Sequence, residues 1–294
     1  MPSILPQLII NGLIAGSIYA LAACGFALVY YVMKFQYFSQ GAILTIAAYM
    51  FFMFLKILGL NYISAAILAV LISIFTAFLT NWLVYRPLRK RKATPTILLI
   101  SSIVLLIFSS SLIQALFGSN TKTINLGKLN KTFDYGFFTI TILQIFIIFF
   151  ALALFLSLWL IIKKTRLGKA MRALADNKDV AQIVGINPEK IYNYTFVLSA
   201  ILGAFAGILI GLEQNLYPRM GVLIIVKGFI SSVVGGLGSV PGSIIGGLFI
   251  GLVENLGIWF LPSGYKDVIS FTIMLVFLLF RPQGILGVKM RDDN

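Results

Sequence analysis

The sequence contains no histidine, a single cysteine and few acidic residues. Without histidine, the chain cannot carry a His-based catalytic triad, a zincin motif or the usual proton relay at physiological pH. The lone Cys24 excludes a disulfide within the chain and a cysteine metal cluster. Enzyme classes that depend on these residues are therefore excluded, and no cofactor or metal site is expected.

Charged residues are also scarce, because they make up only 11% of the 294 residues, whereas 60% are hydrophobic. Soluble domains are about 45–50% apolar and about 25% charged. The mean hydropathy of +1.00 is more than a soluble fold can hide from water. We therefore predict an all-α polytopic membrane protein, with residues 1–294 forming one transmembrane domain.

Apolar runs long enough to be spans occur along the whole chain. A helix needs about 20 apolar residues to cross a bilayer, and the runs lack the alternation of an outer-membrane barrel. Eight firm segments and one doubtful one are predicted: 7–33, 41–59, 62–85, 96–117, 139–162, 191–212, 222–240 (the doubtful one), 243–261 and 267–281. The stretch 222–240 is rich in glycine, and its sequence leaves open whether it crosses fully or is short or re-entrant. No repeat with a clear period is visible.

The net charge of +14 is compatible with nucleic-acid binding, but the basic residues lie between the apolar runs. That pattern is typical of membrane topology, since Lys and Arg stay on the cytoplasmic side. The basic stretches are 86–92, 163–178 and the tail with Arg281, Lys289 and Arg291. We therefore expect no nucleic-acid partner. We place all three basic stretches and the C-terminus on the cytoplasmic side of the membrane, and the N-terminus on the outside. The tail agrees only if 191–281 crosses an even number of times.

The segment 163–190 is too long for a simple turn. Residues 169–185 are predicted to form one amphipathic helix, which Gly185 and Asn187-Pro188 end. Such a helix can lie on anionic lipid, pack on the protein itself or dock into a partner's groove. Its small residues favour docking, because they let another backbone approach closely. They are Ala170, Ala173, Ala175, Ala181 and Gly185.

Glycines recur every fourth residue in two places, at 203, 207 and 211 and at 238, 242 and 246. This spacing is typical of tightly packed membrane helices. Pro241 predicts a break in helical structure, and broken helices in membrane proteins usually line cavities.

Glu254 lies within an apolar run, where a charge costs about 2.5–3.5 kcal/mol on insertion scales. It is a functional candidate for that reason. Two other interpretations remain open: Glu254 reaches the external interface beside Asn255, or it pairs with Lys227. No GxxxxGK[ST] phosphate loop is present, so any ATPase that drives this chain is a separate subunit.

Motifs along nearly the whole chain resemble the LivH-type (H-type) permease subunit of ABC importers for branched-chain amino acids. They are NGLIAGSIYALAACGFALVYY, YRPLRKRKATPTILLIS, TRLGKAMRALADNKDVAQIVGIN, FVLSAILGAFAG, KGFISSVVGGLGSVPGSIIGGLFIGLVE and YKDVISFTIMLVFLLFRPQGILG. The resemblance implies an ABC importer permease fold with about eight or nine membrane segments. It also implies that 163–190 is the EAA-like coupling loop.

The resemblance also implies site residues. The family pattern E-A-A-x-x-x-G matches Asp179, Val180, Ala181 and Gly185, with departures at its first two positions. The residues expected to couple to the ATPase are Ala173, Asp179, Ala181, Gly185 and Asn187. The family's NFAHG matches residues 37–41, with Gln40 in place of the histidine. Candidate pathway or gating residues are Gln40, Gly238, Pro241 and Glu254.

By the same resemblance, the chain is a transport subunit of the bacterial inner membrane and not itself an enzyme. Its implied partners are an M-type permease, two cytoplasmic ATP-binding subunits and a soluble amino-acid-binding protein outside. One alternative is the same architecture carrying polar amino acids, urea or short amides. Another is a stand-alone ion-coupled carrier or channel, which requires a set of ionisable groups in the membrane. A membrane enzyme is a third, weakened by the lack of histidine and of a second buried acid near Glu254.

Overall fold

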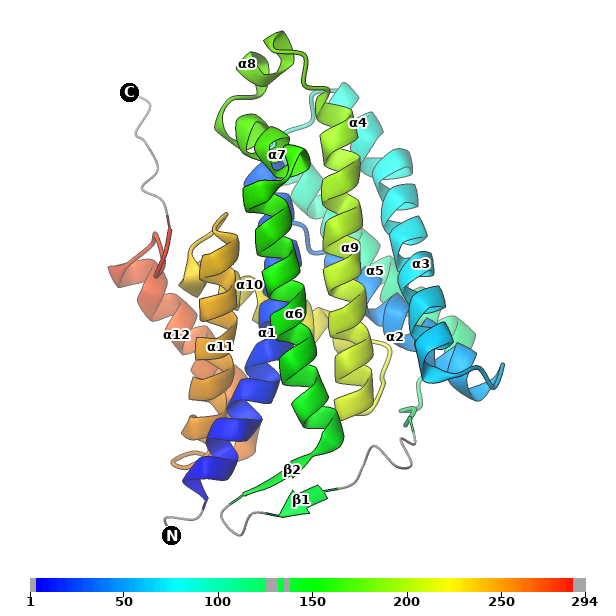
Figure 1. Ribbon diagram of the computed structural model, residues 1–294, viewed down its shortest axis with the longest axis vertical. Helices are drawn as coiled ribbons and strands as arrows, with labels where there is room; N and C mark the ends of the chain where they lie inside the picture. Colours follow the sequence, from blue (N-terminus) through cyan, green and yellow to red (C-terminus); the bar gives the residue numbers. More distant parts are fainter. Residues whose placement is uncertain (1–3, 125–131, 135–137, 288–294) are drawn as a thin grey trace.

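The chain forms a bundle of apolar helices in the computed structural model, which describes residues 4–124, 132–134 and 138–287 (Figure 1). Seven helices are long and apolar enough to cross a membrane, and two more apolar helices are shorter. In chain order the nine are α1 (Leu5–Met33), α2 (Gln40–Lys56), α3 (Tyr62–Thr80, continued by η1, Asn81–Tyr85, and α4, Arg86–Lys90), α5 (Pro95–Phe117), α6 (Ile142–Lys164), α9 (Pro188–Glu213), α10 (Met220–Gly235), α11 (Val240–Gly257) and α12 (Lys266–Phe280, preceded by η3, Ser263–Tyr265). Two short helices follow α6, namely α7 (Arg166–Asp176) and α8 (Lys178–Ile183).

Every predicted span has a counterpart among these helices, with three differences of note. The basic stretch 86–92 was expected as a loop, but the third span continues through it to Lys90, since Pro87 fits the first turn of α4. The predicted second span 41–59 is shorter than expected, because α2 ends at Lys56. The doubtful stretch 222–240 is the 16-residue helix α10 and the turn after it.

Two long helices form the centre of the bundle. In their most apolar windows α1 is 83% buried and α9 is 72% buried, whereas the peripheral α3, α5 and α6 are 22–28% buried. Glycine makes the tight packing possible: a Cβ on Gly251 of α11 would overlap the backbone of Gly16 in α1. A Cβ on Gly207 of α9 would likewise overlap the carbonyl of Leu44 in α2. The predicted role of the recurring glycines in helix packing is therefore confirmed at 207.

Apart from α6, α7 and α8, the helices form two halves with the same order of elements. In each half a long buried helix is followed by a segment of six residues (34–39 or 214–219), a short helix and two further apolar helices. The halves run in opposite directions, since α1 rises in Figure 1 where α9 descends. The short helices α2 and α10 meet at their first turns, where Gly41 and Gly221 are in close backbone contact. This is the inverted-repeat arrangement found in many transporters.

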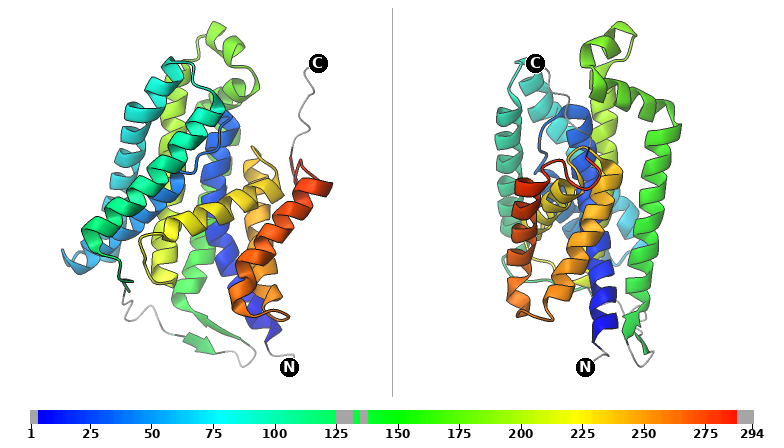
Figure 2. Two further views of the ribbon diagram at one scale, coloured as in Figure 1. Left: turned by 180° about the vertical axis from the view of Figure 1, so that it is seen from behind. Right: turned by 90° about the vertical axis from the view of Figure 1, so that its left-hand side faces the viewer.

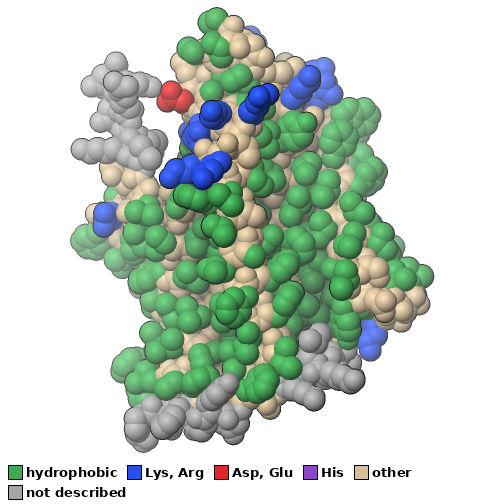
Figure 3. Space-filling model, in the orientation of Figure 1, with side chains coloured by type: hydrophobic (Ala, Val, Ile, Leu, Met, Phe, Trp, Pro, Cys, Tyr) green, Lys and Arg blue, Asp and Glu red, His purple; other side chains and the backbone are tan. Residues whose placement is uncertain are grey.

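The two ends of the bundle differ in charge. The helices α4, α7 and α8 lie at one end, and Lys and Arg gather there in Figure 3; we call this the basic end. The chain starts at the opposite end, where β1 (Thr132–Asp134) pairs antiparallel with β2 (Thr139–Thr141). Four helices, α9 to α12, lead from α8 to residue 281; three of them are long enough to span a membrane, and α10 is shorter. Lys289 and Arg291 lie outside the described residues.

Candidate functional site

The segment expected to form one helix over 169–185 is two helices that meet at Asn177, so that prediction is wrong. Asn177 has an extended backbone, with φ −148° and ψ 113°. Its Oδ1 accepts hydrogen bonds from the N–H groups of Asp179 (2.9 Å) and Val180 (3.1 Å). An asparagine side chain that caps a new helix in this way competes with continuation of the old one. The chain therefore turns between α7 and α8.

The first helix, α7, packs on the protein. Its inner residues Gly168, Met171 and Leu174 are buried, and the helix contacts α1 and α9. Arg172 donates a hydrogen bond from Nη1 to the carbonyl of Ile162 at 2.5 Å, which ties α7 back to the end of α6. The predicted coupling residue Ala173 is half-buried in this contact. The segment was expected to lie on lipid, to pack on the protein itself or to dock into a partner; α7 packs on the protein itself.

The second helix, α8, presents large apolar side chains to solvent. Val180 is 54% exposed, Ile183 is 84% exposed and Val184 is 68% exposed. We call these three residues the α8 surface. Ala181 faces inward and is buried. The surface available to a partner therefore consists of large apolar residues, rather than the small ones from which docking was inferred.

The other predicted coupling residues shape the ends of α8. Gly185 has φ +86° and ends the helix, with its N–H bonded to the carbonyl of Gln182 and the N–H of Ile186 bonded to that of Ala181. A Cβ at Gly185 would meet nothing within 4 Å. Asn187 caps α9 through hydrogen bonds from Glu189 and Lys190. Asp179 is exposed in the first turn of α8.

Glu254 is fully buried and pairs with Lys227, one of the two alternatives to a functional role left open by the sequence. Lys227 of α10 bonds to Glu254 of α11 and also contacts Asp267 of α12 at 2.7 Å. Ser270 donates to Oε1 of Glu254, and Tyr19 of α1 donates to Oε2 at 3.1 Å. These five residues, which we call the charge cluster, join four helices.

Electrostatics explains why these residues occur together. A buried charge is tolerated when it is paired and its remaining hydrogen-bonding capacity is used. One ammonium and two carboxylates give the cluster a formal charge of −1. Glu254 is enclosed, but the side chain of Asp267 is 55% exposed, so the cluster opens to its surroundings through Asp267.

A polar cavity of about 310 Å³ lies beside the charge cluster and shares Tyr19 with it. Gln144 of α6 donates to Glu213 of α9 at 2.9 Å, and Lys266 donates to Asn255 at 3.2 Å. These four residues line the cavity near the ends of α6, α9, α11 and α12 that lie away from the basic end (Figure 2). Both a carboxylate and an ammonium thus face one space.

Gln40 is fully buried between α1 and α9. Its side chain fills the space left by Gly25 and Gly203, and its Oε1 accepts a hydrogen bond from Ser199 at 3.2 Å. A Cβ at Gly25 would overlap the amide of Gln40. In this structure Gln40 therefore packs within the protein.

The predicted pathway residues do not form a single site. Gly238 lies in the α10–α11 turn with φ +83°, and Pro241 is exposed in the first turn of α11. The expected break in helical structure is confirmed at this turn. Glu254 lies thirteen residues after Pro241 on the same helix, or about 20 Å along its axis.

A polar network at the basic end was not predicted from the sequence. Arg89 of α4 donates from Nη2 to Glu189 of α9 at 2.9 Å and to Asn81 of η1 at 3.0 Å. Asn81 in turn donates to Asn193 of α9 at 2.6 Å. The bonds to α9 join residues a hundred or more positions apart along the chain, so no local pattern signals the network. It fixes the start of α9, just after α8, to the third span.

Apolar helices in inverted halves, with an amphipathic pair of short helices at the basic end, define a helical transport permease. No group of residues suited to hold a metal ion occurs within the described ranges 4–124, 132–134 and 138–287. The chain belongs to the family described as the permease component of branched-chain amino acid transport systems, whose model matches residues 8–278. The LivH-type resemblance is thereby confirmed.

Similar proteins cover nearly the full length. The high-affinity branched-chain amino acid transport permease BraD of Pseudomonas aeruginosa is 34% identical over 96% of this chain and 95% of its own. LivH of Escherichia coli K12 is 34% identical with the same coverage. The probable LivH of Methanocaldococcus jannaschii is 32% identical over 97% of this chain and 94% of its own.

A solved structure shares the fold. It is a chain of PsaBC from Streptococcus pneumoniae, determined in complex with a Fab, with a TM-score of 0.53. The match covers 93% of this chain and 91% of that chain at 14% identity. At that identity the likeness shows the fold alone.

Proposed function

We propose that this chain is the H-type subunit of an ATP-driven importer that moves branched-chain amino acids into the cytoplasm by alternating access. The α8 surface is the observation that carries the proposal. Three large apolar side chains exposed at the charged end of a permease are suited to dock into a groove on a partner. Because the chain has no phosphate loop, that partner is a separate ATP-binding subunit. The chain itself is thus a transport subunit and not an enzyme.

The contact is suited to transmit motion. The helix α7 links α8 to the bundle and contacts α1 and α9, its two most buried helices. Gly185 and Asn187 fix the turn from α8 into α9 by backbone conformation and capping. A displacement of α8 would therefore reach the core of the bundle through α7 and α9, which act as a lever. Ala173, Asp179, Ala181, Gly185 and Asn187 belong to this lever in the proposal.

The orientation follows from the distribution of charge. Lys and Arg are retained on the cytoplasmic side, so the basic end faces the cytoplasm of a bacterial inner membrane. The C-terminal end of α12 points toward the basic end, and α1 begins at the opposite end (Figure 2), which then faces outside. The charge cluster and the polar cavity then lie toward the external side.

The implied partners are an M-type permease, two ATP-binding subunits and an external amino-acid-binding protein. The polar cavity with Glu213 and Lys266 lies on the side from which that binding protein would deliver substrate. The candidates for the pathway or gate remain Glu254, Gln40, Gly238 and Pro241. Glu254 belongs to the charge cluster. The same architecture carrying polar amino acids, urea or short amides is the alternative.

Competition for uptake tests the substrate class. The complete complex, in cells that lack other leucine transporters, is supplied with labelled leucine. Unlabelled isoleucine and valine are expected to suppress the uptake, whereas serine and urea at the same concentration leave it unchanged. Suppression by urea or serine, with none by valine, would assign the transporter to the alternative cargo.

A further inference from the structure

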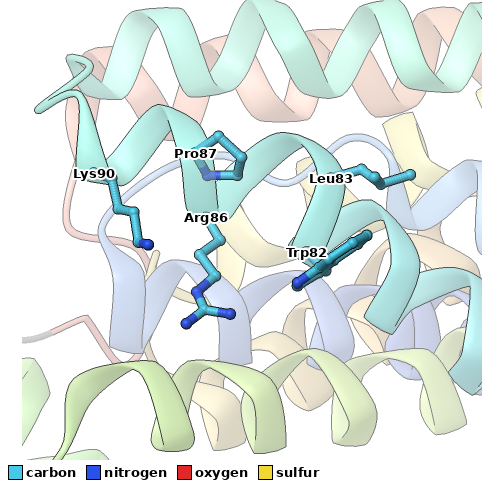
Figure 4. Close-up of a pocket in the computed structure, with 5 residues that line it drawn as sticks. All are labelled: Trp82, Leu83, Arg86, Pro87 and Lys90. Atoms are coloured by element: carbon cyan, nitrogen blue, oxygen red, sulfur yellow. The ribbon is translucent and has the colours of Figure 1, made fainter.

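The outer surface of the third span carries a groove of about 450 Å³ near the basic end (Figure 4). Trp82, Leu83, Arg86, Pro87 and Lys90 line it. Trp82, Arg86 and Lys90 are spaced four residues apart, which places them along one side of a helix. Figure 4 shows their side chains pointing to the same side. The groove thus joins an aromatic ring to two cations.

The positive charges of Arg86 and Lys90 are not neutralised by nearby acidic residues among those that the structure describes. Arg86 lies near the carboxylate of Glu189, with 3.9 Å between Nε and Oε2. The same Oε2 accepts the much closer hydrogen bond from Arg89 at 2.9 Å. The Nε of Arg86 is buried and makes no hydrogen bond in the described part of the chain. Lys90 is exposed. Three cations against one carboxylate leave a local charge of +2.

The other part of the groove is apolar and open. Trp82 is 53% exposed and Leu83 is 55% exposed. The exposed residues Phe75 and Phe78 continue this apolar surface along α3, away from the basic end. Tryptophan is enriched at membrane interfaces because its ring is apolar and its N–H is polar. A ligand that fits has an anionic head and an apolar tail.

We propose that this groove binds the headgroup of an anionic phospholipid. The phosphate lies between Arg86 and Lys90, where guanidinium and ammonium donors form charge-assisted hydrogen bonds with its oxygens. The glycerol and the upper acyl chains pack on Trp82 and Leu83. A free phosphate would use the cations but leave the apolar half of the groove unoccupied. The site is independent of the transported substrate.

Fluorescence of Trp82 tests the proposal directly. The sequence has three tryptophans, so Trp159→Phe with Trp259→Phe leaves Trp82 as the reporter. The full chain is reconstituted in phosphatidylcholine that contains a small fraction of brominated phosphatidylglycerol or of brominated phosphatidylcholine. Bromine quenches tryptophan at close range. We expect brominated phosphatidylglycerol to be enriched at Trp82 by roughly 25-fold, since each of the two basic residues near the membrane surface provides about fivefold.

Arg86→Gln with Lys90→Gln is expected to lower this preference to parity. Lys90→Gln alone changes one exposed side chain and is expected to lower it partly. The control Lys163→Gln with Lys164→Gln removes two exposed cations at the end of α6 and is expected to leave the preference intact. Equal quenching by the two lipids in the parent would overturn the proposal. So would a preference that survives Lys90→Gln undiminished, or one that inorganic phosphate in the buffer abolishes.

Discussion

Lys227 lies at the centre of the charge cluster. It is the only cation of the charge cluster and faces carboxylates from two helices, α11 and α12. The sequence pointed to Glu254 because an acid within an apolar run is costly, and it named Lys227 as a partner. Tyr19, Asp267 and Ser270 were not predicted. Tyr19 lies 235 residues from Glu254, and Asp267 and Ser270 belong to a different helix from it.

Lys227→Met is expected to destabilise the protein more than Glu254→Gln. Removing Lys227 leaves Glu254 buried without its counter-ion, which costs about 3–5 kcal/mol. Glu254→Gln leaves Lys227 paired with Asp267, so the cost is that of a weakened hydrogen bond, about 1–3 kcal/mol. The midpoint of thermal unfolding in detergent measures both variants. A larger loss for Glu254→Gln would contradict this account of the cluster.

Gly185→Arg is expected to abolish uptake while the protein stays folded in the membrane, because a long side chain at the end of α8 blocks the partner. Positive φ adds a cost of about 1–2 kcal/mol for any residue other than glycine. Gly59→Arg is the matched control: Gly59 has φ +64°, and a Cβ there also meets nothing within 4 Å. It lies after α2, away from the basic end. Uptake and membrane content are measured for both variants, and equal loss of uptake would assign the effect to backbone strain.

Among the elements, the short helices α7 and α8 show where sequence patterns succeed and fail. Amphipathic spacing predicted a helical segment here, and helices are present. The pattern could not predict the turn at Asn177, because that turn depends on one side chain capping the next helix. Nor could the pattern predict that Ala181 is buried and Ile183 is exposed. Which side of α8 faces the protein depends on how α7 packs on α1 and α9.

Ile183→Asp with Val184→Asp is expected to prevent binding of the ATP-binding subunit with little change in stability. Both side chains are largely exposed, so the substitution removes apolar contact area for a partner without opening a cavity. Co-purification of the tagged chain with the ATP-binding subunit measures the effect. Ile57→Asp, at an exposed position after α2, is the control and is expected to retain the subunit. Retention by the double variant would remove the α8 surface from the interface.

The molecule as a whole is two inverted halves packed around α1 and α9. Hydropathy predicted every apolar helix and most boundaries, since lipid demands long apolar runs. It could not predict the inverted halves, because the matching helices share length and order rather than residues. Nor does hydropathy show that Phe35 and Tyr37, which lie between α1 and α2, are buried in the protein without being helical.

Gly251→Leu is expected to disrupt the whole bundle rather than one site. A Cβ at Gly251 would overlap the backbone of Gly16, so α11 must separate from α1, the most buried helix. Overpacking of this kind costs about 1–3 kcal/mol or more. Gly264→Leu is the control, since a Cβ at Gly264 meets nothing within 4 Å. Yield of monodisperse protein in detergent reports the outcome. A normal yield of Gly251→Leu would contradict the close packing of α1 on α11.

Uptake of labelled leucine into proteoliposomes tests the central claim most directly. The chain is reconstituted alone or together with the M-type permease, the ATP-binding subunits and the binding protein, with or without ATP on the side of the ATP-binding subunits. The account predicts uptake only by the complete complex and only with ATP. Uptake by this chain alone in the absence of ATP would contradict it and would identify a stand-alone carrier.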